Sequence, residues 1–116
     1  MKLAIVGSRT FDDVRLFIES IPEKSEIEMI ISGGANGADL YAEKYAEIEN
    51  IPLKIFKPQW DVYGKKAGML RNSDIVNECD KLIAFWDGKS KGTLDSITKA
   101  KTQDKLLKIV RFDVSN

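Results

Sequence analysis

The chain contains no histidine and only one cysteine, Cys79, among its 116 residues. A single cysteine cannot form an internal disulfide, and the usual zinc ligands are missing without imidazoles or paired thiolates. We therefore expect a protein of a reducing, cytoplasmic setting that has no metal site.

Neither sign of charge is in excess, because 18 Lys and Arg residues balance 18 Asp and Glu residues. A molecule without net charge produces no overall field that favours long polyanions or membrane surfaces. Long apolar runs are also missing, and the N-terminal run at residues 3–6 is too short for a signal peptide or a membrane span. These absences argue against a membrane partner and make nucleic acid an unfavoured one.

The composition that remains is typical of a folded protein, with 43% apolar and 31% charged residues. A length of 116 residues can supply one hydrophobic core and is too short for two. We expect residues 1–116 to form a single domain with one site.

Short apolar runs alternate with segments of helical periodicity along the chain. The runs predict five strands, at residues 3–6, 29–31, 53–56, 82–86 and 107–110. The periodicity predicts four helices: three follow caps at Thr10, Asn36 and Thr93, and one covers about residues 69–79. The side chains expected to face the core from these helices are Val14, Phe17, Ile18, Ile21, Ala38, Tyr41, Ala42, Tyr45, Leu70, Ile75, Val76, Cys79, Leu94, Ile97 and Ala100.

Strands that alternate with helices in this way pair in parallel through right-handed crossovers. The pattern therefore predicts an α/β fold, a three-layer sandwich with helices on both faces of a five-stranded parallel sheet. Apolar and polar residues alternate at 53–56, which favours an edge strand. Ligands of such sheets bind beyond the carboxyl ends of the strands, so the loops after the first, second and fourth strands are expected to form the site.

The first and second of these loops are suited to anions. Gly7-Ser8-Arg9 follows the first strand, where a turn into a helix, a hydroxyl and a guanidinium can bind phosphate, although a turn with a surface arginine explains it equally. Residues 32–39 then hold three glycines in five positions and nearly match the dinucleotide fingerprint, with Ser32 in place of the first glycine. The next strand ends without the ribose-binding carboxylate, which argues against NAD in its usual pose. A phosphate cradle is favoured over a plain turn, because one glycine would suffice for a turn.

The loop after the fourth strand contains Gly88-Lys89-Ser90, but Ile83 occupies the position of the first P-loop glycine, so a P-loop is excluded. What remains is a flexible polar loop that enters a helix at Gly92-Thr93 and can bind an anion, with Asp87 available to a ribose hydroxyl. A solvated turn is the alternative.

The connection at residues 57–68 places Trp60 and Tyr63 beside glycines and lysines, and Arg71-Asn72 follows at a helix start. The two aromatic side chains either stack on a base or pack the loop down. An arginine in the first turn of a helix opposes the helix dipole, which favours a role in anion binding.

The order of these four motifs resembles the YspA-type SLOG family, and the resemblance extends from Leu3 to Val110. It implies a Rossmann-like fold with strand order 3-2-1-4-5 that binds nucleotides or nucleotide-derived ligands, as a sensor or a processing enzyme. The wider superfamily also includes the LOG phosphoribohydrolases and DprA, a single-strand DNA binder. Its members often form dimers, so the resemblance leaves a homodimer open.

The LOG enzymes carry a catalytic Glu three residues after the Gly-Thr pair that Gly92 and Thr93 match, and here that position is Ser96. Asp95 lies one residue away, about 100° around a helix, so hydrolysis by the LOG mechanism is in doubt. Asp39 and Asp87 are the carboxylates that can substitute, by hydrogen bonding a ribose hydroxyl or by acting as a general base.

The favoured function is binding of a nucleotide-like, phosphate-bearing small molecule, with no cofactor assigned. An N-glycosidic hydrolase is the second hypothesis, and a DprA-like nucleic-acid binder the third. The residues expected to contact the ligand are Gly7, Ser8, Arg9, Gly33, Gly34, Ala35, Gly37, Asp39, Trp60, Tyr63, Arg71, Asn72, Trp86, Asp87, Gly88, Ser90, Gly92 and Thr93.

Overall fold

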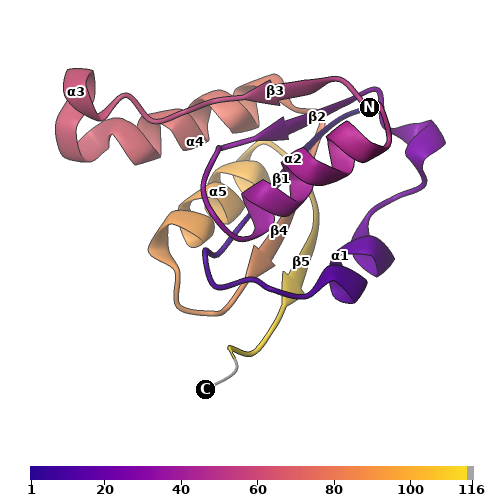
Figure 1. The fold of residues 1–116 in the computed structure, drawn as a ribbon. Helices are drawn as coiled ribbons and strands as arrows, with labels where there is room; N and C mark the ends of the chain where they lie inside the picture. Colours follow the sequence, from indigo (N-terminus) through magenta and orange to yellow (C-terminus); the bar gives the residue numbers. More distant parts are fainter. Residues whose placement is uncertain (115–116) are drawn as a thin grey trace.

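A computed structural model describes residues 1–114 of the chain. Its five strands pair in parallel in one sheet of order β3-β2-β1-β4-β5 (Figure 1). They are β1 (Lys2–Gly7), β2 (Met29–Ser32), β3 (Leu53–Ile55), β4 (Lys81–Trp86) and β5 (Leu106–Arg111). The structure confirms the predicted Rossmann-like α/β fold and the strand order. The edge position of β3 is confirmed too, and all three of its residues are exposed.

Helices cover both faces of the sheet, and one short helix within the connection after β3 stands apart from it (Figure 1). The helices are α1 (Val14–Ser20), α2 (Ala38–Ile48), α3 (Trp60–Tyr63), α4 (Ala67–Glu78) and α5 (Lys91–Thr102), with single 3-10 turns at Lys24–Glu26 and Gly64–Lys66. Within residues 1–114, no helix has both the length and the apolar character needed to cross a membrane.

The core has two halves, one on each face of the sheet. Leu3 and Ile5 of β1 point to the face covered by α1 and α2, where Phe17 stacks on Phe85 at 5.4 Å between ring centroids. Ala4 and Val6 point to the opposite face, beneath α4 and α5. The continuous apolar run in β1 is therefore explained by burial on both faces.

None of the three predicted helix caps is the residue that the structure uses. Asp13, not Thr10, caps α1 and accepts a hydrogen bond from the Leu16 amide at 3.0 Å. Gly37, not Asn36, precedes α2, and its φ of 77° favours glycine. Ser90, not Thr93, caps α5. Helices α1 and α2 therefore begin later in the sequence than the predicted caps implied, and α5 begins earlier.

Four side chains predicted to face the core are exposed instead: Val14, Ile18, Leu70 and Leu94. Leu94 is exposed because α5 turns a different face to the sheet, whose buried positions are Thr93, Ser96, Ile97 and Ala100. These positions are spaced at the helical repeat, but two of them are polar. A pattern of hydrophobic residues alone therefore cannot identify this face of the helix. Tyr41 and Tyr45, expected in the core, are half-buried and pack against its edge.

Candidate functional site

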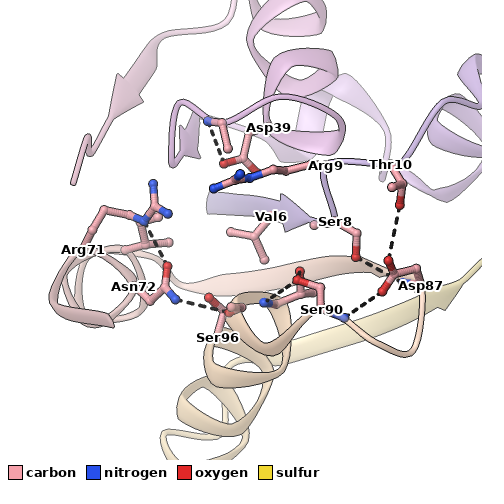
Figure 2. Close-up of a pocket in the computed structure, with 15 residues that line it drawn as sticks. Val6, Ser8, Arg9, Thr10, Asp39, Arg71, Asn72, Asp87, Ser90 and Ser96 are labelled. Carbon is pink, nitrogen blue, oxygen red and sulfur yellow. Dashed lines mark hydrogen bonds between the residues drawn. The ribbon is translucent and has the colours of Figure 1, made fainter. Parts of the chain in front are cut away.

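A cavity of about 340 Å³ lies beyond the carboxyl ends of β1 and β4, and we call it the inner compartment (Figure 2). The loops after β1, β2 and β4 and the helices α4 and α5 contribute to its wall. Its lining residues are Val6, Gly7, Ser8, Arg9, Thr10, Ala35, Asp39, Arg71, Asn72, Ile75, Asp87, Ser90, Gly92, Thr93 and Ser96. The site thus lies where the topology predicts it, next to the central strands whose connections leave on opposite faces of the sheet.

A second hollow of about 430 Å³ adjoins the first, and we call it the outer compartment. Arg9, Ala35 and Arg71 line both compartments, so these three residues form the boundary between them. The other residues of the outer compartment are Gly33, Gly34, Asn36, Lys57, Pro58 and Trp60.

The ends of two side chains lie against the backbone of Gly33, where β2 ends. A Cβ at this position would lie 2.6 Å from Arg71 Nη1 and 2.7 Å from Asp39 Oδ2. A Cβ here would push the ends of both side chains away, so glycine leaves the room in which the carboxylate and the guanidinium lie close together. The glycine cluster therefore positions side chains in addition to any contact with a ligand.

Asp39, in the first turn of α2, is a buried carboxylate with one free oxygen. The residue is 4% exposed, and its Oδ2 accepts a hydrogen bond from the Ala35 amide at 3.2 Å. Oδ1 has no hydrogen-bond partner among the described residues. Burial raises the pKa of Asp39 from its ordinary 3.8 to about 6, although the Ala35 amide and the charge of Arg71 act in the opposite direction.

Arg71 of α4 is half-buried beside Asp39 and is held by carbonyl groups. Nη1 donates to the backbone oxygens of Gly33 and, at 3.4 Å, Phe56, and Nε donates to Asn72 Oδ1 at 3.0 Å. Burial lowers the pKa of Arg71, the charge of Asp39 raises it, and the charge of Arg9 lowers it again. The two guanidiniums therefore repel each other across the cavity, and an anion between them would relieve that repulsion.

Asp87, the other candidate carboxylate, organises the loop after β4. Its Oδ1 accepts from the amides of Lys89 and Ser90, both at 2.8 Å, and its Oδ2 accepts from Thr10 Oγ1 at 3.3 Å. Its own amide donates to Ser8 Oγ at 3.2 Å, which joins this loop to the loop after β1. The amides of Lys89 and Ser90 lower the pKa of Asp87, so this group is ill-suited to accept a proton as a base.

The position of the LOG catalytic Glu lies in the cavity wall but carries a hydroxyl. Ser96 lines the inner compartment and is 2% exposed. Asp95, one residue earlier, instead pairs with Lys99 at 2.8 Å and accepts from Asn72 Nδ2 at 3.1 Å. Asp95 is thus committed to holding α4 against α5.

The structure brings most of the predicted ligand residues into the two compartments, and Tyr63 lines an adjoining hollow that it shares with Arg71. Gly37, Trp86 and Gly88 do not line either compartment. Trp86 donates from Nε1 to Ser90 O at 3.0 Å and lies under the Arg111 guanidinium, which also packs against Gly88. These contacts shape the loops instead of the cavity surface.

Sequence reasoning missed seven lining residues: Val6, Thr10, Asn36, Lys57, Pro58, Ile75 and Ser96. Lys57 could have been found, because it directly follows the predicted strand at residues 53–56. The carboxyl end of that strand lies at the same edge of the parallel sheet as the glycine-rich loops. Among residues 1–114, no group of three histidine, cysteine or acidic side chains is placed to hold a metal ion.

Comparison with known proteins places the chain in a family. The model of the YspA, cpYpsA-related SLOG family matches residues 1–63. The chain is also similar to the Gene 61 protein of Mycobacterium phage D29, with 30% identity over 109 residues that cover 85% of this chain and 87% of that protein. No solved structure gives a significant match. The chain belongs to the YspA, cpYpsA-related SLOG family.

Proposed function

We propose that this chain binds a nucleotide or nucleotide-derived small molecule that bears phosphate, at the carboxyl ends of its strands, as a sensor or a processing domain. Membership of the SLOG family is consistent with a nucleotide-related function. The inner compartment also lies where parallel α/β sheets bind their ligands.

One observation carries the proposal: Asp39, which has an unpartnered acceptor, and two arginines without salt bridges line the same cavity. Asp39 Oδ1 is buried without a donor, and such an atom is costly unless a ligand supplies one. Arg9 and Arg71 line the same space and form no ion pair among the described residues. A sugar hydroxyl would satisfy Asp39 and a phosphate would satisfy the two guanidiniums, so a sugar phosphate meets both requirements.

Thermal unfolding in the presence of a panel of nucleotides and nucleosides tests the proposal. A nucleotide at about 100 times its Kd adds about 2.7 kcal/mol to the free energy of unfolding, which raises Tm by several degrees. The matching nucleoside and inorganic phosphate, used as controls, should each give a much smaller rise because each occupies half of the site. If no nucleotide in a broad panel changes Tm, the proposal is wrong.

A hydrolytic activity is the second candidate, and the titration of Asp39 favours it. A carboxylic acid with a pKa of about 6 can donate or accept a proton near neutral pH, as a general acid or base must. Cleavage of an N-glycosidic bond would then depend on Asp39, since Ser96 has no acidic group. Release of free base from nucleotides should follow the ionisation of Asp39 with pH and be abolished in Asp39→Asn, and no release at high protein concentration would exclude this candidate.

A further inference from the structure

Charge is divided unequally between the two compartments. Both carboxylates of the site, Asp39 and Asp87, line the inner compartment. The outer compartment is lined by Arg9, Lys57 and Arg71, and none of its lining residues is acidic. The outer compartment therefore has a local positive charge, although the whole molecule has none.

These three cations form no salt bridge in the part of the chain that the structure describes, although the charge of Asp39 acts on Arg71 from a greater distance. The ion pairs found within residues 1–114 engage the N-terminus, Lys2, Arg15, Lys24, Lys54 and Lys99. The Lys57 stem instead runs along Gly34, with Cγ 3.4 Å from the place where a Cβ would be. Carbonyl oxygens hold Arg71 in place beside the same turn. Three positive charges are thus gathered around the loop after β2, and Asp39 offsets them only in part.

We infer that the ligand carries a chain of at least two phosphates, with its sugar in the inner compartment and its second phosphate in the outer one beside Lys57. The inference rests on the proposed function and adds to it the ligand's class and direction. The first phosphate lies at the boundary, between Arg9 and Arg71, and the chain continues outward. The ligand is then a nucleoside diphosphate, a polyphosphate or a diphosphate ester, and a nucleoside monophosphate fills only part of the site.

The reverse orientation conflicts with the charges. Trp60 borders the outer compartment and is 55% exposed, so a base could stack on it. An uncharged base there would leave Lys57 without a counterion and would direct the phosphates toward Asp39 and Asp87. Like charges in a partly buried site repel strongly, so this orientation is the less stable one.

Calorimetric titration in buffer without Mg²⁺ tests the inference with AMP, ADP, ATP and ADP-ribose, and with the guanosine nucleotides in parallel. We expect ADP and ADP-ribose, in which a second ribose is esterified to the diphosphate, to bind about 10-fold more tightly than AMP because of the added charge-assisted contacts. Equal affinities for the mono- and diphosphates would overturn the inference while leaving the proposed function intact. The absence of binding by every nucleotide would instead contradict the proposed function.

The variant Lys57→Gln tests whether the tighter binding of diphosphates depends on the outer compartment. It should lower the ratio of ADP to AMP affinity by about 5-fold because one charge-assisted contact is removed, whereas Lys57→Arg should preserve most of that ratio. Lys65→Gln, a matched change at an exposed lysine that lines neither compartment, should leave the ratio unchanged. An unaltered ratio in Lys57→Gln, with unfolding like that of the wild type, would overturn the assignment.

Discussion

Replacing Arg71 by methionine should lower the affinity for a nucleotide by at least about 100-fold, equivalent to about 2.7 kcal/mol. The guanidinium lies at the boundary of both compartments, so its loss removes contacts with a phosphate on either side. Its position is fixed before binding by the carbonyls of Gly33 and Phe56, so little side-chain entropy is lost when a ligand arrives. Calorimetric titration with the tightest ligand of the panel measures the effect.

The control is Arg15→Met, because Arg15 is an exposed arginine that pairs with Glu19 at 3.5 Å on the surface of α1. This variant should bind nucleotide like the wild type. Denaturant unfolding of both variants separates a binding defect from a folding defect, since methionine preserves the apolar stem that packs in α4. Wild-type affinity in a correctly folded Arg71→Met would contradict the placement of the phosphate between the guanidiniums.

The fold could be predicted to a large extent because its strands are buried on both faces. Residues 3–6 and 82–85 are almost completely inaccessible, so they form continuous apolar runs that stand out from any helical pattern. The outer strand β3 lies at the predicted edge of the sheet, but all three of its residues are exposed and no one-sided burial follows the alternation. Helix rotation was less predictable, because a helix beside a polar cavity buries polar residues. Ser96 and Asn72 occupy inward positions that an apolar pattern assigns to others, such as Leu94 and Leu70.

The glycine-rich loops could be located from the sequence, because they directly follow the apolar strands. The division of the site into two compartments could not be predicted. Arg9, Lys57 and Arg71 are far apart in sequence, and only the sheet order and the course of α4 bring them together. The different behaviour of Asp39 and Asp87 was equally hidden, because it depends on burial and on which amides each carboxylate accepts. Sequence supplied the residue types, and three-dimensional placement supplied their chemistry.

Asp39→Asn should make the free protein more stable at neutral pH, by up to about 3 kcal/mol. The folded state raises the pKa of Asp39 to about 6 from an ordinary value of 3.8, so ionisation of this carboxyl costs the folded state more than the unfolded one. Between about pH 4 and pH 6 the folded state holds the extra proton, and wild-type stability therefore falls as pH rises through this window. Above pH 6 the full cost is present, and asparagine never incurs it.

Denaturant unfolding of the wild type and of Asp39→Asn from pH 3.5 to 8 measures this difference. The two proteins should converge near pH 4 and separate as pH rises, with the variant the more stable at pH 7.5. Asp74→Asn, at an exposed carboxyl of α4, should show no such divergence. A variant less stable than the wild type at pH 7.5 would mean that the Asp39 charge stabilises the folded chain.

The same substitution should weaken nucleotide binding, because an amide cannot offer a hydroxyl the charged acceptor that Asp39 presents at Oδ1. If Asp39→Asn makes the folded state more stable and also weakens nucleotide binding, then Asp39 serves binding at a cost to the stability of the fold. A ligand that donates a hydrogen bond to Oδ1 would favour the ionised carboxylate and lower the pKa of Asp39. Binding near pH 6 should then release a fraction of a proton in the wild type and none in Asp39→Asn, which calorimetry in buffers of different ionisation enthalpy detects.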